Sequence, residues 1–272
     1  IVRYIKFADP VVAQICATNF GDGNGLSEED AAKVTSLGSA FKNNTEITSF
    51  DELAEFTGLT KIDNLAFQNC ANLTSITIPH NVTALGDNSL QNCSSLSEIV
   101  IPENVYHIGS AALYGVGVKT LTIPDNITSV GNYAFAYCPK VEKIIFGRGT
   151  NGYRYAFIGT HAKELHVSDI AYWCNLIILD EGDYFPQASN FILYAGGERV
   201  TGEVIVPKDV TSIRAGLFQS NQDITSMRIE GNITSIGKLA FNGCSNLISI
   251  NNTNSVEGLG NASFAACSKL QV

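Results

Sequence analysis

A short pattern returns along this chain at a nearly constant interval, and this periodicity limits the folds that the chain can adopt. Each copy reads roughly V-x-x-I-G-x-x-A-F-x-x-C-x-x-L-x-x-I-x-I-P. The clear copies follow each other after 22 or 23 residues, apart from one interval of 61 residues. Repeats of about 20 to 50 residues predict a stacked array. With one weaker copy, nine units are anchored at Phe41, Phe67, Leu90, Leu113, Phe135, Phe157, Phe218, Phe241 and Phe264.

Each part of the repeat has a structural meaning. The I-x-I triplet, such as Ile76 to Ile78, alternates as a half-buried strand does, and Pro79 after it cannot donate to a strand ladder. The segment from Ala-Phe to Leu has apolar residues at steps of three, which favours a short helical or 3₁₀ return. One unit cannot bury its apolar face alone, so we predict a solenoid with strands about 4.8 Å apart in one parallel sheet.

The cysteines follow the repeat. Five of the seven occupy one position of the pattern, namely Cys70, Cys93, Cys138, Cys244 and Cys267. Val116 takes that position in another copy, so we interpret it as a small apolar core site with buried free thiols. The spacing alone does not exclude a disulfide between neighbouring copies. No C-x-x-C occurs and the four histidines are not spaced as zinc ligands are, so no metal site is predicted.

This pattern resembles the BspA-type leucine-rich repeats of bacterial surface proteins over almost the whole chain. The stretches NVTALGDNSLQNCSSLSEIVIPENV and DNITSVGNYAFAYCPKVEKIIF carry the resemblance best. The segment from Trp173 to Ile213 resembles the longer variant unit of that family, and ICATNFGDGNGLSEEDAAKVTSLGSAF resembles its entry segment. The resemblance implies an α/β solenoid, a right-handed leucine-rich repeat superhelix with parallel strands, short helical or 3₁₀ returns and a helical N-terminal cap.

The resemblance also implies a function class. Such proteins are secreted or surface-attached in host-associated anaerobes, and they are thought to bind host proteins, matrix components or other bacteria. The family has no general catalytic residues to carry over to this chain. We therefore expect an extracellular or cell-surface location and a protein or glycan ligand, with no enzymatic activity.

The pattern also gives a domain organisation. Residues 1–33 are predicted to form a helical N-terminal cap, with one helix after Asp9 and a second N-capped by Ser27. Residues 34–272 are predicted to form the solenoid, with an irregular insertion at about 168–202. Within it, FILYAGGERV predicts a hairpin that turns at Gly196 and Gly197. The last unit stops before its strand is finished, so we expect an unprotected final coil at Val272 or a partner there, self-association included.

Two segments carry alternative interpretations. Residues 19–30 contain Asp22, Asn24 and Gly25, which echo a calcium loop, but the stretch is too short and lacks the first acidic ligand. A glycine-rich turn between the cap helices is therefore favoured. Trp173 with Tyr172 is a candidate for stacking on a sugar, although anchoring of the insertion is the favoured role.

Charge and composition exclude several functions. The net charge of −9 argues against a nucleic acid or an anionic membrane surface as the main partner. No apolar run reaches the length of about 18 residues that a membrane helix needs, so no membrane insertion is expected. Neither a phosphate loop nor a nucleophile motif occurs, so no cofactor is predicted. An enzyme built on Asp180, Glu181 and Asp183 near Trp173 is the least favoured hypothesis.

The outward positions of the strands are the candidate binding surface. The residue between the two inward ones is, in successive units, Thr77, Val100, Thr122, Ile145, His166, Ile205, Arg228 and Asn251. Exposed apolar residues beside an arginine are typical of a protein-binding surface. We therefore predict that the ligand contacts are Val100, Ile145, His166, Ile205 and Arg228. One alternative is that β-branched residues merely suit a strand face, and another is that the array is a spacer or stalk in a larger surface protein.

Overall fold

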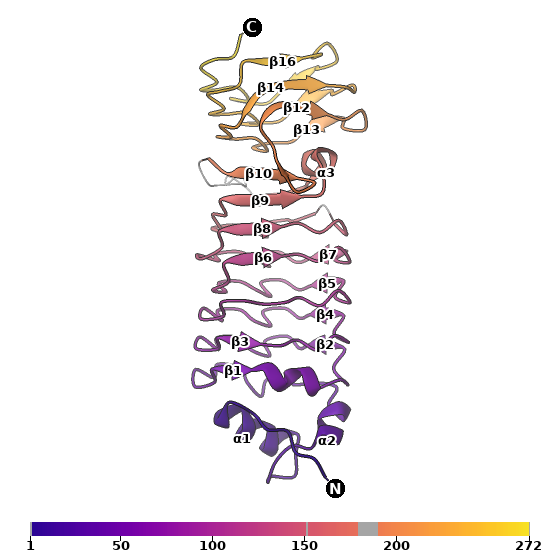
Figure 1. Cartoon of the computed structure of the whole chain (residues 1–272), viewed down its shortest axis with the longest axis vertical. Helices are drawn as coiled ribbons and strands as arrows, with labels where there is room; N and C mark the ends of the chain where they lie inside the picture. Colours follow the sequence, from indigo (N-terminus) through magenta and orange to yellow (C-terminus); the bar gives the residue numbers. More distant parts are fainter. Residues whose placement is uncertain (1, 151, 179–189, 272) are drawn as a thin grey trace. The chain divides into compact units, whose positions relative to one another are not determined.

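The computed structural model describes residues 2–150, 152–178 and 190–271. The chain forms two compact units, one of Ile1–Val141 with Arg154–Thr160 and the other of Glu142–Tyr153 with His161–Val272. In each unit, coils of the repeat stack so that equivalent short strands lie parallel to each other (Figure 1). The predicted parallel-strand solenoid is therefore confirmed.

In the described part of the chain the helices are few and short. They are α1 (Pro10–Asn19), α2 (Glu28–Lys33), the 3₁₀ helix η1 (Asp51–Glu55) and α3 (Ile170–Asn175). The strands of the first unit are β1 (Ser49–Phe50), β2 (Lys61–Ile62), β3 (Ser75–Ile76), β4 (Ala84–Leu85), β5 (His107–Ile108), β6 (Thr120–Thr122) and β7 (Ser129–Val130). Those of the second unit are β8 (Lys143–Ile145), β9 (Glu164–Val167), β10 (Ile192–Ala195), β11 (Glu198–Arg199), β12 (Gly202–Val206), β13 (Ser212–Ile213), β14 (Ile224–Ile229), β15 (Ser235–Ile236), β16 (Ser249–Asn251) and β17 (Gly258–Leu259).

The strands form two columns in each unit, so the prediction of one sheet is wrong. In the first unit β1 pairs with β3, while β2, β4, β5 and β7 form a separate parallel sheet. In the second unit β12, β14 and β16 form one sheet and β13, β15 and β17 another. The additional strands are each two residues long, and a glycine follows most of them. Two residues are too few for side-chain alternation to reveal a strand.

The glycine that follows most of the additional strands allows neighbouring coils to approach each other closely. A Cβ atom on Gly86 would lie 2.5 Å from Asn64 Oδ1 and 2.6 Å from the Asn64 backbone nitrogen. The same crowding recurs one coil further on, where a Cβ on Gly109 would lie 2.6 Å from the Asp87 nitrogen. Only glycine fits at these contacts, which explains why the I-G step recurs in the repeat.

The returning segments are single turns. Around the anchor Phe67, the Cys70 N–H donates to the Phe67 carbonyl at 3.2 Å, which accounts for the apolar spacing of three. Leu65 and Asn69, two residues before and two residues after the anchor, have φ of 64° and 62°. Left-handed residues at both ends keep each return to a single turn. The same two positions are left-handed in most other coils.

The anchor side chains stack through the core. Ring centroids of neighbouring anchors lie 5.3 Å apart for Phe41 and Phe67, and 5.4 Å apart for Phe135 and Phe157. The Phe218 and Phe241 rings are also stacked, at 5.3 Å. Aromatic pairs of this kind contribute about 0.5–1.5 kcal/mol beyond the burial of their area.

The cysteines at the repeated position link one coil to the next. The thiol of Cys70 donates to the carbonyl of the preceding anchor, Phe41, at 3.0 Å, and Cys93 donates in the same way to Phe67 at 3.2 Å. Cys138, Cys244 and Cys267 make the equivalent bonds. Every cysteine is free, and all except the half-exposed Cys267 are buried, so the predicted thiols are confirmed. The position is therefore a donor site as well as a small apolar one.

Other residues at this repeat position also form hydrogen bonds with the backbone. Thr160 replaces cysteine and donates its hydroxyl to the carbonyl of Phe135 at 2.7 Å. Asn44 and Asn221 take the position in the first repeat after the cap and in the first repeat after the insertion. There the side-chain oxygen accepts backbone N–H bonds from its own coil, including that of Ile224 at 3.1 Å. Asparagine thus closes the turn locally in the repeat that begins each series.

We predict that the native chain resists thiol modification except at Cys267. Burial raises the pKa of Cys70 and Cys138 to about 11, so neither forms the reactive thiolate at mildly alkaline pH. Cys267 is half-exposed and should react first with a maleimide. Mass spectrometry of the labelled peptides gives the order of reaction, with Cys267→Ser as the control. Early labelling of Cys70, or a disulfide-linked Cys70–Cys93 peptide, would contradict this account.

The N-terminal helices lie where the sequence places them. Asp9 N-caps α1, since its Oδ1 accepts from the Val11 and Val12 N–H groups at 2.8 and 3.2 Å. Its Oδ2 accepts from the N–H and hydroxyl of Thr48, at 2.6 and 2.9 Å, just before β1. Burial alone would raise the pKa of Asp9, but these hydrogen bonds outweigh it and hold the pKa below the ordinary 3.8. One carboxylate thus ties the cap to the first coil.

We predict that Asp9→Ala lowers the free energy of unfolding by about 2 kcal/mol at neutral pH, because it removes a helix cap and leaves Thr48 without its acceptor. The depressed pKa means that the carboxylate stabilises the fold above pH 3.8 and loses this effect as the pH falls through its folded-state pKa. The difference between parent and variant should therefore shrink in acid. Urea unfolding of both proteins at neutral pH and at a pH below 3.8 measures this difference.

The matched control is Asp22→Ala. Asp22 also lies in the N-terminal region, but its carboxylate bonds only to Tyr4 and to N–H groups of its own turn. We expect a smaller loss for this variant. Equal urea midpoints for Asp9→Ala and the parent would show that the cap is not tied to the first coil through this carboxylate.

Candidate functional site

The strand face of the second unit brings together part of the predicted site. Strands β8, β9 and β10 run parallel, and their register aligns Ile145 with His166 and His166 with Tyr194. In the next sheet the register aligns Ile205 of β12 with Arg228 of β14. The predicted pairs Ile145–His166 and Ile205–Arg228 are thus neighbours, whereas His166 and Ile205 are not paired.

Tyr194 is the residue that the sequence prediction missed. Its ring stacks on the imidazole of His166 with centroids 4.3 Å apart and planes 4° apart. The other face of the strand is the core side, since Phe191 and Leu193 are buried. This alternation was visible in FILYAGGERV, but the irregular interval hid the fact that the segment continues the parallel sheet.

The predicted hairpin is present and adds to this sheet. Strand β11 pairs antiparallel with β10, with Ala195 opposite Glu198. Gly196 and Gly197 form the turn with φ of 61° and 87°, which glycine adopts without strain. The insertion therefore adds a parallel strand, β10, and an edge strand, β11, to the sheet that carries His166.

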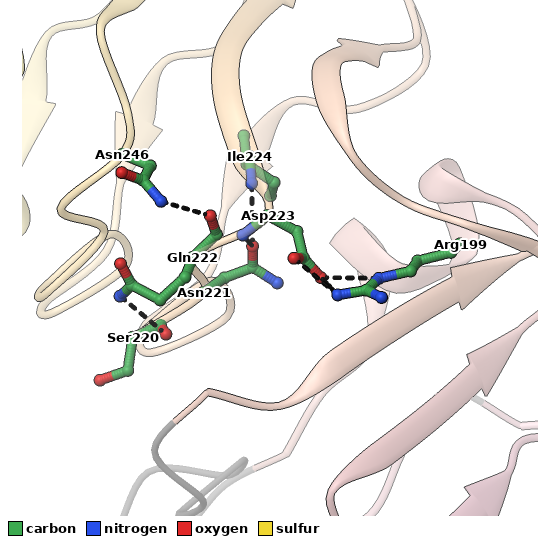
Figure 2. A network of polar contacts seen from close by, with 7 residues as sticks. All are labelled: Arg199, Ser220, Asn221, Gln222, Asp223, Ile224 and Asn246. Atoms are coloured by element: carbon green, nitrogen blue, oxygen red, sulfur yellow. Dashed lines mark hydrogen bonds and ion pairs between the residues drawn. The ribbon is translucent and has the colours of Figure 1, made fainter.

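A polar network ties this hairpin to the turn that precedes β14 (Figure 2). The Arg199 guanidinium donates to both carboxylate oxygens of Asp223, at 2.8 Å to Oδ1 and 3.1 Å to Oδ2. The side-chain oxygen of Asn221 accepts from the backbone N–H groups of Asp223 and Ile224 at 3.0 and 3.1 Å. Asn246 on the next coil donates to the Gln222 carbonyl at 2.9 Å. These bonds hold the start of β14, the strand that carries Arg228.

Arg228 lies between two acidic side chains. Its Nη1 lies 3.0 Å from Glu230 Oε1, and its Nε lies 3.8 Å from Glu203 Oε2. Ile205, its in-register neighbour, is 41% exposed. This part of the face combines one apolar side chain with charges that are already partly neutralised. Such a surface suits a protein ligand better than a polyanion.

Val100 does not lie on a strand, so its predicted strand position is wrong, whereas its role as a ligand contact stays a prediction. Its side chain is 80% exposed, but residues 97–102 have no strand geometry and lie between β4 and β5 in the chain. The alternation of Ile99, Val100 and Ile101 specifies which side chains face outward. It does not ensure that the backbone reaches ladder partners on the neighbouring coils. Val100 also belongs to the first unit, apart from the other four candidates.

The insertion is anchored in the core. Trp173 is fully buried and contacts Phe191 and Phe218, with ring centroids 6.0 and 6.5 Å away, which confirms the anchoring role. The Tyr172 hydroxyl lies 2.6 Å from the carbonyl oxygens of both Gly147 and Thr150. The acidic residues of the enzyme hypothesis, Asp180, Glu181 and Asp183, lie outside the described residues.

The glycine-rich segment of the cap is a closed turn. Asp22 Oδ1 accepts from the N–H groups of Asn24 and Gly25 at 2.9 and 3.1 Å, and Oδ2 accepts from the Tyr4 hydroxyl at 2.8 Å. Both carboxylate oxygens of Asp22 therefore have hydrogen-bond donors within the protein. Among the described residues, no group of three or more His, Cys, Asp or Glu side chains is arranged to hold a metal ion.

The last described coil leaves apolar side chains at the surface. A hollow of about 670 Å³ lies there, lined among others by Ile236, Ile250, Leu259 and Phe264. Self-association through this coil stays a prediction.

Comparison with known proteins identifies the repeat. The model of the BspA type leucine rich repeat region matches residues 31–142, 60–171 and 199–272, with six copies. The chain belongs to the BspA-type leucine-rich repeat family. Proteins with these repeats are bacterial surface proteins and are generally not enzymes. No curated protein matches the chain, and no helix among the described residues is long and apolar enough to span a membrane.

Solved structures of bacterial leucine-rich repeat proteins are similar to this chain. One from Bacteroides ovatus is 23% identical, with a TM-score of 0.49, and the match covers 87% of this chain and 69% of that one. A leucine rich cell surface protein from Faecalibacterium prausnitzii is also 23% identical at a TM-score of 0.49, covering 86% and 68%. The pneumococcal vaccine antigen PcpA is 14% identical at a TM-score of 0.46, covering 78% and 66%.

Proposed function

We propose that this chain is a recognition module at a bacterial cell surface and that the strand face of its second unit binds a protein ligand. The observation that carries the proposal is the row formed by Ile145, His166 and Tyr194. These side chains lie in register on three parallel strands, and two of them are stacked aromatic rings. Aromatic residues and arginine are the residue types that contribute most to protein interfaces.

The rigidity of the platform supports the same function. The Phe146 N–H donates to the His166 carbonyl at 2.9 Å, and the Ile192 N–H donates to the Lys163 carbonyl at 2.7 Å. The backbone that carries the row is therefore fixed before a ligand arrives. Binding to such a surface loses little conformational entropy in ordering the protein. Membership of the BspA-type family supports the cell-surface location and a ligand on a host cell or another bacterium.

The test is a binding screen of the purified chain against immobilised host matrix proteins, mucin polypeptides and bacterial surface proteins, measured by surface plasmon resonance. We predict that Tyr194→Ala and Ile145→Glu each weaken binding by at least about tenfold, because they remove or charge the centre of the contact. Arg228→Glu should act in the same direction. Circular dichroism and thermal unfolding confirm that each variant folds.

The matched control is Tyr106→Ala, which removes an exposed tyrosine that belongs to the first unit and not to this row. It should bind as the parent does. Binding that survives Tyr194→Ala and Ile145→Glu would exclude this strand face as the site. A chain that binds none of the proteins would favour the spacer or stalk role, in which the ligand is bound elsewhere in a larger protein.

A further inference from the structure

Three tyrosines of the first unit adopt a backbone conformation that bulky residues rarely occupy. Tyr133, Tyr137 and Tyr155 have φ of 61°, 52° and 53°. They occupy the two left-handed positions of the returning turn, two residues before or two residues after the anchor. At the later position all other copies have Asn, Gly, Ser or Ala, namely Asn43, Asn69, Asn92, Gly115, Gly159, Ser220, Gly243 and Ala266.

Stability alone does not favour tyrosine at these positions. Asparagine and glycine adopt the left-handed region at little cost, whereas a bulky residue there is an outlier. In the first coils asparagine also adds bonds at this position, since Asn92 donates to Asn69 and Asn69 donates to Asn43, both at 2.8 Å. Strained residues of this kind cluster at functional sites. Leu65 and Leu239 take the earlier position in other coils, so Tyr137 at the later position is the residue that most clearly points to a surface role.

The rings form two contacting pairs, Tyr114 with Tyr137 and Tyr133 with Tyr155, which we together name the tyrosine ridge. Tyr133 and Tyr155 stack with centroids 5.7 Å apart, and Tyr114 and Tyr137 lie 5.2 Å apart. Tyr133 is 42% exposed and Tyr137 is 51% exposed. A Cβ on Gly159 would lie 2.6 Å from Tyr137 Cδ1, so the bare backbone of the next coil makes room for that ring.

The turns that carry the ridge have few charged side chains, although the Asp87 carboxylate of the neighbouring coil accepts the Ser110 N–H at 2.7 Å. The three turns that carry the ridge, residues 109–117, 131–139 and 154–160, contain one charged residue, Arg154, in a chain of net charge −9. The Arg154 guanidinium carbon lies 5.1 Å from the centre of the Tyr155 ring. The other polar groups nearby in these turns are a hydroxyl and an amide, on the exposed residues Ser110 and Asn132. Phenol rings combined with neutral hydrogen-bonding groups complement a ligand that is itself neutral, with apolar C–H faces and many hydroxyls.

We propose that the tyrosine ridge binds a neutral oligosaccharide. Within each pair the ring centroids lie 5.2 or 5.7 Å apart, so each pair offers two aromatic rings to neighbouring sugar units of one chain. The pyranose C–H faces contact the exposed rings, while the phenol hydroxyls, Asn132 and Ser110 bond the sugar hydroxyls. This surface lies in the first unit and is separate from the strand face that is proposed to bind a protein.

The test uses the purified full chain and immobilised neutral tetrasaccharides of glucose, N-acetylglucosamine, mannose and galactose. The key variant is Tyr133→Asn with Tyr137→Asn, which removes both exposed rings and installs a residue that suits the left-handed backbone. Tyr106→Asn is the matched control, because Tyr106 is 52% exposed in the same unit but outside the ridge. Circular dichroism verifies that all variants fold.

We expect the parent and Tyr106→Asn to bind at least one tetrasaccharide and the double variant to lose at least about tenfold in affinity. Tyr133→Phe should retain most of the binding, because it keeps the ring. The strand-face variant Ile145→Glu should bind sugar as the parent does, so the two proposals fail or succeed separately. The proposal is overturned if no tetrasaccharide binds, or if the double variant binds as the parent does. Loss of binding to enzymatically deglycosylated mucin in the double variant would instead assign the ridge to a protein partner.

Discussion

The structure depends on hydrogen bonds that the anchor of most coils makes with the next coil. The N–H of Phe67 donates to the Ser89 carbonyl of the next coil at 2.8 Å, and the carbonyl of Phe67 accepts the thiol of Cys93 from that coil. The anchor side chain is buried and packs against its equivalents. Because the same residue provides the core contact and both links between coils, the repeat fixes side-chain order and backbone spacing together.

This arrangement explains which features the sequence could predict. The outward strand positions of Ile145, His166, Ile205 and Arg228 could be predicted because alternation in the I-x-I triplet specifies outward side chains. The column of cysteines could be predicted because stacking aligns equivalent positions. The second column of strands was missed because two residues show no alternation. Tyr194 was missed because pairing between distant segments depends on the path of the chain through the insertion, which the interval of the repeat does not encode.

The departures from the repeat carry the functional proposals. The insertion breaks the period and supplies Tyr194, which stacks on His166. Tyr137 stands at a left-handed position of the returning turn where the other coils have Asn, Gly, Ser or Ala. In both cases a smaller side chain would suffice for the stacking of the coils. A solenoid thus separates the residues that keep the coils stacked from those that are free to vary at the surface.

The central claim is that the strand face is fixed before any ligand binds, and amide hydrogen exchange of the free chain tests it most directly. The account predicts that amides in β8, β9 and β10 exchange as slowly as the anchor amides, because both are bonded between coils and open only in large cooperative events. Mass spectrometry of peptides containing Phe146, Ile192 and Phe218 gives the comparison. Fast exchange at β10 beside slow exchange at the anchors would contradict a preformed recognition surface.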